Sequence, residues 1–125
     1  AGEAEVNQAV VAAREAFDNG NWGEVTPAQR AKLLWRVADL IEAQGEELAS
    51  LETLDGGKLL SGVRNGEIPS AAESFRYYAG WCTKMEGRTP QISIPGMKFH
   101  AYTQREPIGV VAQIVPWNGP LVMAA

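Results

Sequence analysis

The chain has 125 residues, of which 46% are hydrophobic and 21% charged, and its formal net charge at neutral pH is -4. These values are those of an ordinary globular protein, and an acidic balance with no Lys/Arg cluster argues against nucleic-acid binding. The single cysteine excludes an internal disulfide framework. No apolar run approaches the ~18–20 residues that a membrane helix needs, and no signal peptide opens the chain. We therefore predict a cytoplasmic protein that binds neither nucleic acid nor membrane.

Apolar residues recur every three or four positions in three stretches, which predicts about three amphipathic helices. The first stretch predicts a helix over residues 3–19. The second begins at a Thr-Pro-Ala-Gln capping box and runs over residues 27–56. Gly45 interrupts it, so this region is either two helices or one bent helix. Residues 64–66 predict a loop, and the third stripe predicts a helix over residues 68–82.

The pattern changes after residue 90. Residues 91–94 and 98–103 flank Pro95-Gly96, which suits the centre of a type II turn, and together they predict a β-hairpin. The nearly continuous, β-branched run over residues 108–115 is typical of a strand covered on both faces, as in a parallel sheet. Pro120 then suits the first turn of a helix. A strand, a short turn and a helix in this order begin the nucleotide site of many open α/β folds.

Four short sequences in this chain are informative together: REPIGVV at residues 105–111 with IVPWN at 114–118, RYYAGW at 76–81, and LETLDGGK at 51–58. They resemble the aldehyde dehydrogenase superfamily, in which Asn is usual at the position of Gly56. The opening helices also match the family in the order of their residues. The resemblance covers nearly the whole chain in register, which makes coincidence a poor explanation.

The resemblance implies an α/β fold, of which this chain would be the N-terminal portion. Residues 1–89 would form the helical part of the Rossmann-like cofactor domain, residues 90–106 the hairpin of the oligomerisation arm, and residues 107–125 the first strand and turn of the nucleotide-binding core. The nucleophilic cysteine, the glutamate base and the phosphate loop of the family lie further along. We therefore expect a fragment of a longer enzyme, which is inactive as these 125 residues alone and forms a homo-oligomeric dimer or tetramer when full-length.

The implied function is oxidation of an aldehyde to a carboxylic acid with NAD or NADP, through a thiohemiacetal on a cysteine outside this chain. By resemblance Asn118 stabilises the oxyanion, because its side-chain amide offers two N–H donors without a charge that must be desolvated. The residues that match the family's cofactor-binding stretch are Val115, Pro116, Trp117 and Asn118. No metal site is expected.

Gly119 departs from the family, which commonly has an aromatic residue after the asparagine, in the wall of the substrate tunnel. We hypothesise that the tunnel is wider here and admits a bulky or aromatic aldehyde. Val122 and Met123 would line the same wall.

Simpler interpretations exist for several residues. Without the family register, Asn118 would be a turn residue, as Asn before Gly usually is. Cys82 lies on an apolar stripe and is expected in the core, and His100 has no partner in sight. Glu67 is expected to interact favourably with the dipole of the helix that follows it. Lys58 cannot end a phosphate loop because the required upstream glycine is missing. The alternative for the whole chain is a catalytically silent assembly module, and a relative that makes acyl-CoA is a variant within the superfamily.

Overall fold

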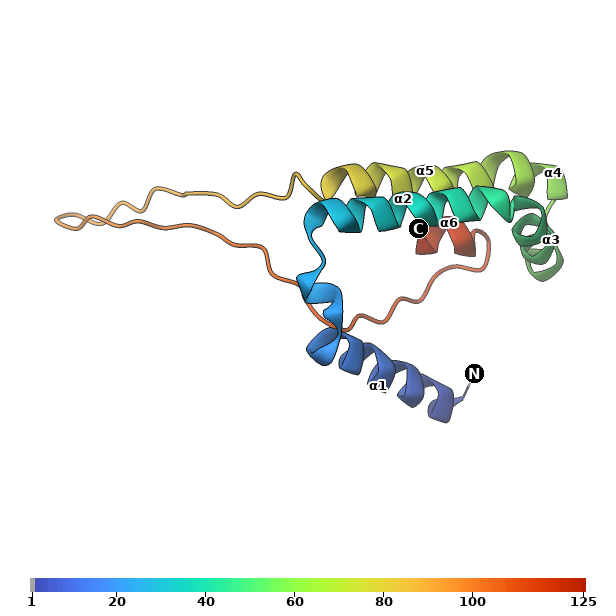
Figure 1. Cartoon of the computed structure of the whole chain (residues 1–125), viewed down its shortest axis with the longest axis horizontal. Helices are drawn as coiled ribbons and strands as arrows, with labels where there is room; N and C mark the ends of the chain where they lie inside the picture. Colours follow the sequence, from blue (N-terminus) through green and yellow to red (C-terminus); the bar gives the residue numbers. More distant parts are fainter. Residues whose placement is uncertain (1) are drawn as a thin grey trace.

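The computed structural model describes residues 2–125 (Figure 1). Its elements are α1 (Glu3–Asn19), the 3₁₀ turn η1 (Asn21–Glu24), α2 (Pro27–Ala43), α3 (Gly45–Gly56), α4 (Leu60–Gly62), the π-helical turn η2 (Val63–Glu67), α5 (Ile68–Trp81) and α6 (Pro120–Ala124). The helices gather at one end, and a long extended finger, residues 85–107, projects from them (Figure 1).

The core forms where α2 and α5 lie side by side (Figure 1). Small side chains meet at this contact, and Ala38, Ala71 and Ala72 are completely buried, so the two helix backbones can approach closely. The short helix α6 returns to the same core from the far end of the chain, where Leu121 and Val122 pack against it. The core therefore fixes the C-terminal segment as well as the two long helices.

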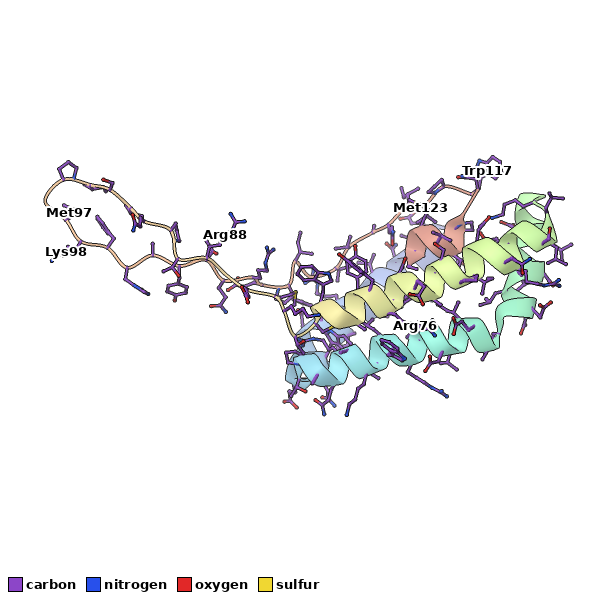
Figure 2. All side chains as sticks on the ribbon, turned by 90° about the horizontal axis from the view of Figure 1, so that it is seen from above. Arg76, Arg88, Met97, Lys98, Trp117 and Met123 are labelled. Atoms are coloured by element: carbon purple, nitrogen blue, oxygen red, sulfur yellow. The ribbon has the colours of Figure 1, made fainter. Side chains whose placement is uncertain are left out.

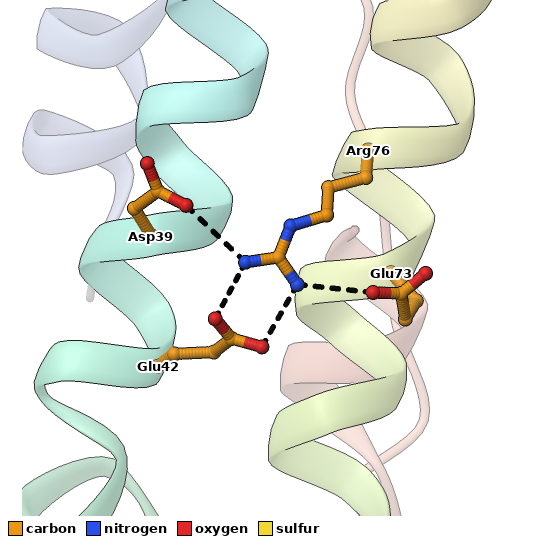
Figure 3. A network of polar contacts seen from close by, with 4 residues as sticks. All are labelled: Asp39, Glu42, Glu73 and Arg76. Atoms are coloured by element: carbon orange, nitrogen blue, oxygen red, sulfur yellow. Dashed lines mark hydrogen bonds and ion pairs between the residues drawn. The ribbon is translucent and has the colours of Figure 1, made fainter.

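Arg76 on α5 binds the facing side of α2 (Figure 3). Its guanidinium donates to both carboxylate oxygens of Glu42, at 2.5 and 2.8 Å, and to Asp39 at 3.2 Å and Glu73 at 3.0 Å. It also lies over the ring of Trp35, 5.6 Å from the ring centroid. The hydrogen bond from Arg76 lowers the pKa of Glu42, and the hydrogen bonds to Glu42 and Glu73 raise the pKa of Arg76 further above its ordinary value. This network sets how α2 and α5 align.

Several helix predictions are confirmed. Helix α1 has the expected bounds. The capping box at the start of α2 forms, with Thr26 N donating to Gln29 Oε1 at 2.9 Å and Gln29 N donating to Thr26 Oγ1 at 3.3 Å. The stretch interrupted by Gly45 is two helices, and α3 turns sharply away from α2 (Figure 1).

The loop predicted over residues 64–66 is wrong, because these residues belong to the π-helical turn η2. The amide of Ile68 donates to the carbonyl of Val63, five residues earlier, and both side chains are buried in the core. Pro69, one residue further on, has no N–H to donate to the preceding turn. The wider π-helical turn places Val63 and Ile68, five residues apart, on the same buried face. The residues between them include Arg64, Asn65 and Gly66, which are why the sequence alone predicts a loop.

Two expected apolar stripes also differ from the structure. No residue of α1 is buried, because α1 lies apart from the α2–α5 pair (Figure 1). Its stripe meets the extended segment, where Phe17 lies beside Gly109, and this contact among residues 2–125 leaves Phe17 45% exposed. Tyr78 falls on the apolar stripe of residues 68–82 by its spacing from Ala71 and Phe75, yet it is 57% exposed, whereas Ala79 beside it is buried.

The finger folds back at Pro95-Gly96, as predicted (Figures 1 and 2). Met97 N donates to Ile94 O at 3.2 Å, and Gly96 has a φ of 79°, as position three of a type II turn requires. At its base, Thr103 N donates to Arg88 O at 2.8 Å and Arg88 N donates to Thr103 Oγ1 at 2.8 Å.

The residues that the structure describes form no β-strand, so the hairpin strands and the buried strand over residues 108–115 are not formed in this chain. A lone hairpin is marginal, and a buried strand needs sheet partners on its edges. Residues 108–115 have no sheet partner within residues 2–125, and Ile108 and Ile114 are 90% and 99% exposed. Across residues 2–125, no helix has both the length and the apolar character that crossing a membrane would require.

Candidate functional site

The predicted site residues follow one another along the short turn between the extended segment and α6. We call residues 116–119 the Asn118 turn. Trp117 is 72% exposed and projects away from the helices (Figure 2). Among residues 2–125 the side-chain amide of Asn118 has no hydrogen-bond partner, so its two N–H donors are available to a ligand.

Two contacts hold the segment beyond the turn. Gln113 Nε2 donates to Met123 O at 2.8 Å and so connects the extended segment to α6. Val122 packs against the core, whereas Met123 is 51% exposed. Of the three residues expected in a tunnel wall, Gly119 and Val122 are thus half-buried, and Met123 is the most open to solvent.

The Asn118 turn lies against an ionic cluster that consists of Glu52, Lys58 and Glu67. Lys58 Nζ lies 2.8 Å from Glu52 Oε1 and 2.5 Å from Glu67 Oε2, and it donates to the backbone carbonyl oxygen of Asn118 at 3.2 Å. Three contacts use all three donors of an ammonium group. The side chain of Glu52 is only 6% exposed and that of Lys58 18%, so the cluster lies at the edge of the core.

The cluster is electrostatically coupled. Desolvation lowers the pKa of Lys58, but the hydrogen bonds to Glu52 and Glu67 outweigh it, so the pKa is raised overall. The hydrogen bond from Lys58 lowers the pKa of Glu67 against the effect of desolvation. Lys58 is therefore a cation and Glu67 an anion at neutral pH, and their charges stabilise one another.

Sequence reasoning missed this cluster. Glu67 forms an ion pair with Lys58. Because η2 continues directly into α5, the N-terminal end of α5 has no exposed helix start at which Glu67 could act on a helix dipole. The explanation by helix dipole is therefore replaced by an ion pair. The sequence LETLDGGK contains both Glu52 and Lys58 and could have suggested an ion pair between them. It does not show that Lys58 also contacts Asn118, sixty positions further along the chain.

The other two candidate residues lie apart from the Asn118 turn. Cys82 is half-buried, and its thiol lies 3.6 Å from the carbonyl oxygen of Tyr78 one helical turn earlier. His100 is exposed on the finger. Within the described part of the chain, no group of three His, Cys, Asp or Glu side chains could hold a metal ion.

The Asn118 turn therefore joins the extended segment to the start of α6 and lies against the ionic cluster beside the helices. The model of the aldehyde dehydrogenase family matches residues 1–125, and the chain belongs to this family.

Relatives and solved structures agree with this assignment. The chain is 50% identical over 125 residues to aldehyde dehydrogenase family 2 member B4 of Arabidopsis thaliana, covering 99% of the chain and 23% of that protein. It is 46% identical over 123 residues to phenylacetaldehyde dehydrogenase of Pseudomonas fluorescens, covering 96% and 24%. The NAD+ complex of an aldehyde dehydrogenase from Bacillus cereus superposes with a TM-score of 0.89 at 50% identity, covering 99% and 25%. The chain thus spans about a quarter of the length of these relatives.

Proposed function

We propose that this chain is part of an enzyme that oxidises an aldehyde to a carboxylic acid with NAD+ or NADP+. Family membership supports the reaction class. The observation that carries the proposal within this chain is the free amide of Asn118, on a turn that the core and the ionic cluster hold in place.

Asn118 would act on the charge that develops at the aldehyde oxygen. When a cysteine thiolate from outside this chain attacks the aldehyde, the carbonyl oxygen gains negative charge. A neutral amide already aimed at that oxygen stabilises the charge without reorganisation, and removing one such donor typically lowers turnover by ~10²–10³-fold. The thiohemiacetal formed in this way would become a thioester only by giving up a hydride to the oxidised nicotinamide cofactor, and hydrolysis of the thioester would use a base that also lies outside residues 1–125.

Val115, Pro116, Trp117 and Asn118 would contact the cofactor, which supplies a hydride acceptor when bound. The structure is compatible with this role, because an exposed apolar Trp117 lies directly beside a free amide. The rest of such a site would come from other parts of the protein. The division into a helical part, an arm at residues 90–106 and a nucleotide-binding segment is part of the same proposal, as are homo-oligomer formation by the arm and a cytoplasmic location.

The test is made on the complete protein, as aldehyde-dependent formation of the reduced nicotinamide. We expect Asn118→Ala to lower kcat by ~10²–10³-fold. Asn65→Ala, at an exposed position of η2, serves as the matched control and should leave kcat unchanged. Wild-type turnover that survives the loss of Asn118 would refute the role of this residue. A complete protein that forms oligomers without any turnover would favour the silent assembly module, which family membership does not favour.

Gly119 supports a finer proposal, that the substrate is bulky or aromatic. A Cβ built on Gly119 would lie 3.9 Å from Glu67 Oε2, an ordinary contact, so a side chain fits here and its absence leaves space. The name of the phenylacetaldehyde dehydrogenase among the relatives is consistent with an aromatic substrate.

Installing the aromatic residue tests this proposal. Gly119→Phe should lower kcat/KM for an aromatic aldehyde relative to acetaldehyde, and Gly119→Ala, which adds little volume, should change the ratio far less. One methylene more or less in an apolar pocket typically changes the discrimination between two substrates by about 10–200-fold. We therefore expect Gly119→Phe to change the ratio of the two kcat/KM values by roughly tenfold or more. A constant ratio in both variants would contradict the proposal.

A further inference from the structure

Glu52, Lys58 and Glu67 form the ionic cluster on which the Asn118 turn lies, and none of the three has a catalytic role in the proposed reaction. It is the most buried group of charges near the Asn118 turn, and it contacts the turn through the backbone of Asn118 itself. Its members come from α3, from the α3–α4 connection and from η2.

We propose that Lys58 is a positioning residue, which fixes the backbone of Asn118 and thereby the direction in which its side-chain amide points. The inference rests on the proposed function, because it assigns to Lys58 an effect that passes through Asn118.

The two carboxylates of the cluster start from parts of the chain that the core holds in place. Glu52 lies three residues after the fully buried Ala49 on α3, and Glu67 lies directly before the buried Ile68. The backbone at both glutamates is therefore fixed by core packing close by. Lys58 is held between them by two short contacts, so its third donor has a fixed direction, and that donor is directed at Asn118 O.

The chain on the two sides of the turn is restrained unequally. After the turn, α6 packs on the core, and Met123 N donates to Gly119 O at 3.0 Å. Before the turn, the extended segment has no sheet neighbour among residues 2–125, and Ile114 in it is 99% exposed. Within the described residues the Lys58 contact is the one hydrogen bond to the carbonyl of Asn118, so its loss should let this peptide group, and the side chain beside it, reorient.

The neighbours of Asn118 also lie close to the cluster or to the residues beside it. A Cβ on Gly56 would be 3.7 Å from Trp117 O and 3.4 Å from Lys58 Cε, and a Cβ on Gly119 would be 3.9 Å from Glu67 Oε2. Residues 117–119 therefore pass next to Gly56, Lys58 and Glu67, which places the Lys58 hydrogen bond within a larger contact.

The consequence for catalysis follows from geometry. An oxyanion donor works only at hydrogen-bond distance from the reacting oxygen, and a displacement of about 1 Å can cost ~10²-fold in rate. Loss of the Lys58 contact should therefore lower kcat more than it raises KM, because the donor acts on charge that appears during the reaction.

A double-mutant cycle in the complete enzyme tests the inference. Lys58→Met, Asn118→Ala and the double variant are compared for kcat and KM, and Arg64→Met, which breaks an exposed ion pair with Glu46 between the neighbouring elements η2 and α3, is the matched control. We expect Lys58→Met to lower kcat by roughly 10–100-fold in the wild type and by less than about twofold in the Asn118→Ala background. The two effects on kcat should not add, because Lys58 acts on the reaction through Asn118. Lys58→Arg, which keeps the charge, should recover part of the loss. Arg64→Met should leave kcat unchanged.

Because Lys58→Met leaves Glu52 buried without its cation, that variant could fold poorly. Glu52→Gln combined with Lys58→Met removes this charge and is expected to give the same dependence on Asn118. Hydrogen exchange gives a readout separate from activity, and amides of residues 117–119 should exchange faster in Lys58→Met than in Arg64→Met.

The outcomes separate the two proposals. If Asn118→Ala does not lower kcat in the wild type, the proposed function of Asn118 fails. If Asn118→Ala lowers kcat but Lys58→Met lowers it equally in both backgrounds, or not at all, the inference about Lys58 is overturned while the proposed function stands.

Discussion

Gly87 at the base of the finger gives a prediction that follows directly from the geometry. A Cβ built on Gly87 would overlap the carbonyl oxygen of Thr103 on the opposite arm and would lie 3.0 Å from its carbonyl carbon. These are backbone atoms, so they cannot move aside as the tip of a flexible side chain can. In Gly87→Ala the two arms must therefore separate.

The size of the effect follows from the hydrogen bonds at that place. Thr103 N donates to Arg88 O at 2.8 Å, and Arg88 N donates to Thr103 Oγ1 at 2.8 Å. A separation on the order of 1 Å stretches both beyond the useful range of about 2.7–3.2 Å. Each such bond contributes about 0.5–1.5 kcal/mol net, so the base of the finger should lose about 1–3 kcal/mol.

Hydrogen exchange measured on peptides that contain Arg88 and Thr103 is the assay. Since about 1.4 kcal/mol corresponds to a factor of ten, opening of the base in Gly87→Ala should accelerate exchange by roughly 5–100-fold. Gly66→Ala is the control, because a Cβ at Gly66 meets no atom within 4 Å. If both variants exchange at the wild-type rate, the close approach of the two arms at Gly87 is wrong. If the finger also mediates assembly, Gly87→Ala should weaken the oligomer in sedimentation.

Three further predictions concern the helical layer. Arg76→Met should lower the Tm at neutral pH. Arg76 depresses the pKa of Glu42 below its ordinary 4.5, so the stabilisation from this ion pair is present above about pH 4.5 and is lost as the pH falls through the lowered pKa. The Tm values of wild type and variant, plotted against pH, should therefore converge in acid. Parallel curves would contradict this. Thr26→Ala removes the capping box of α2 and should cost about 1 kcal/mol in denaturant unfolding, and an unchanged midpoint would show that the cap contributes nothing. Ala72→Leu forces a larger side chain into a fully buried site and should cost about 1–3 kcal/mol, whereas Ala43→Leu at an exposed position of α2 should be nearly neutral.

Local patterns in the sequence determined much of the fold. The apolar repeat of residues 3–19 and the Thr26–Gln29 capping box specify helices through neighbours three and four positions apart, and α1 and the start of α2 form as predicted. The Pro95-Gly96 turn is equally local, because Pro restricts φ and Gly accepts a positive φ.

Other features depend on partners that sequence spacing cannot identify. The run over residues 108–115 has the composition of a strand. A strand exists only with a neighbour to share its hydrogen bonds, and the described residues place none beside it. The apolar stripe of α1 likewise predicts a buried face, but no residue of α1 is buried in the described part of the chain.

For the candidate site, the sequence by itself determined the position of Asn118, because a family word places it between an extended segment and a helix start. Only the tertiary structure decided what holds it there. Lys58 and Asn118 are sixty positions apart, and Arg76 reaches Glu42 across thirty-four. The Arg76 contact arises where buried alanines bring α2 and α5 together, and the Lys58 contact arises where α6 brings the end of the chain back to the core. The chemistry of the turn is thus local, whereas its orientation depends on packing between distant parts of the chain.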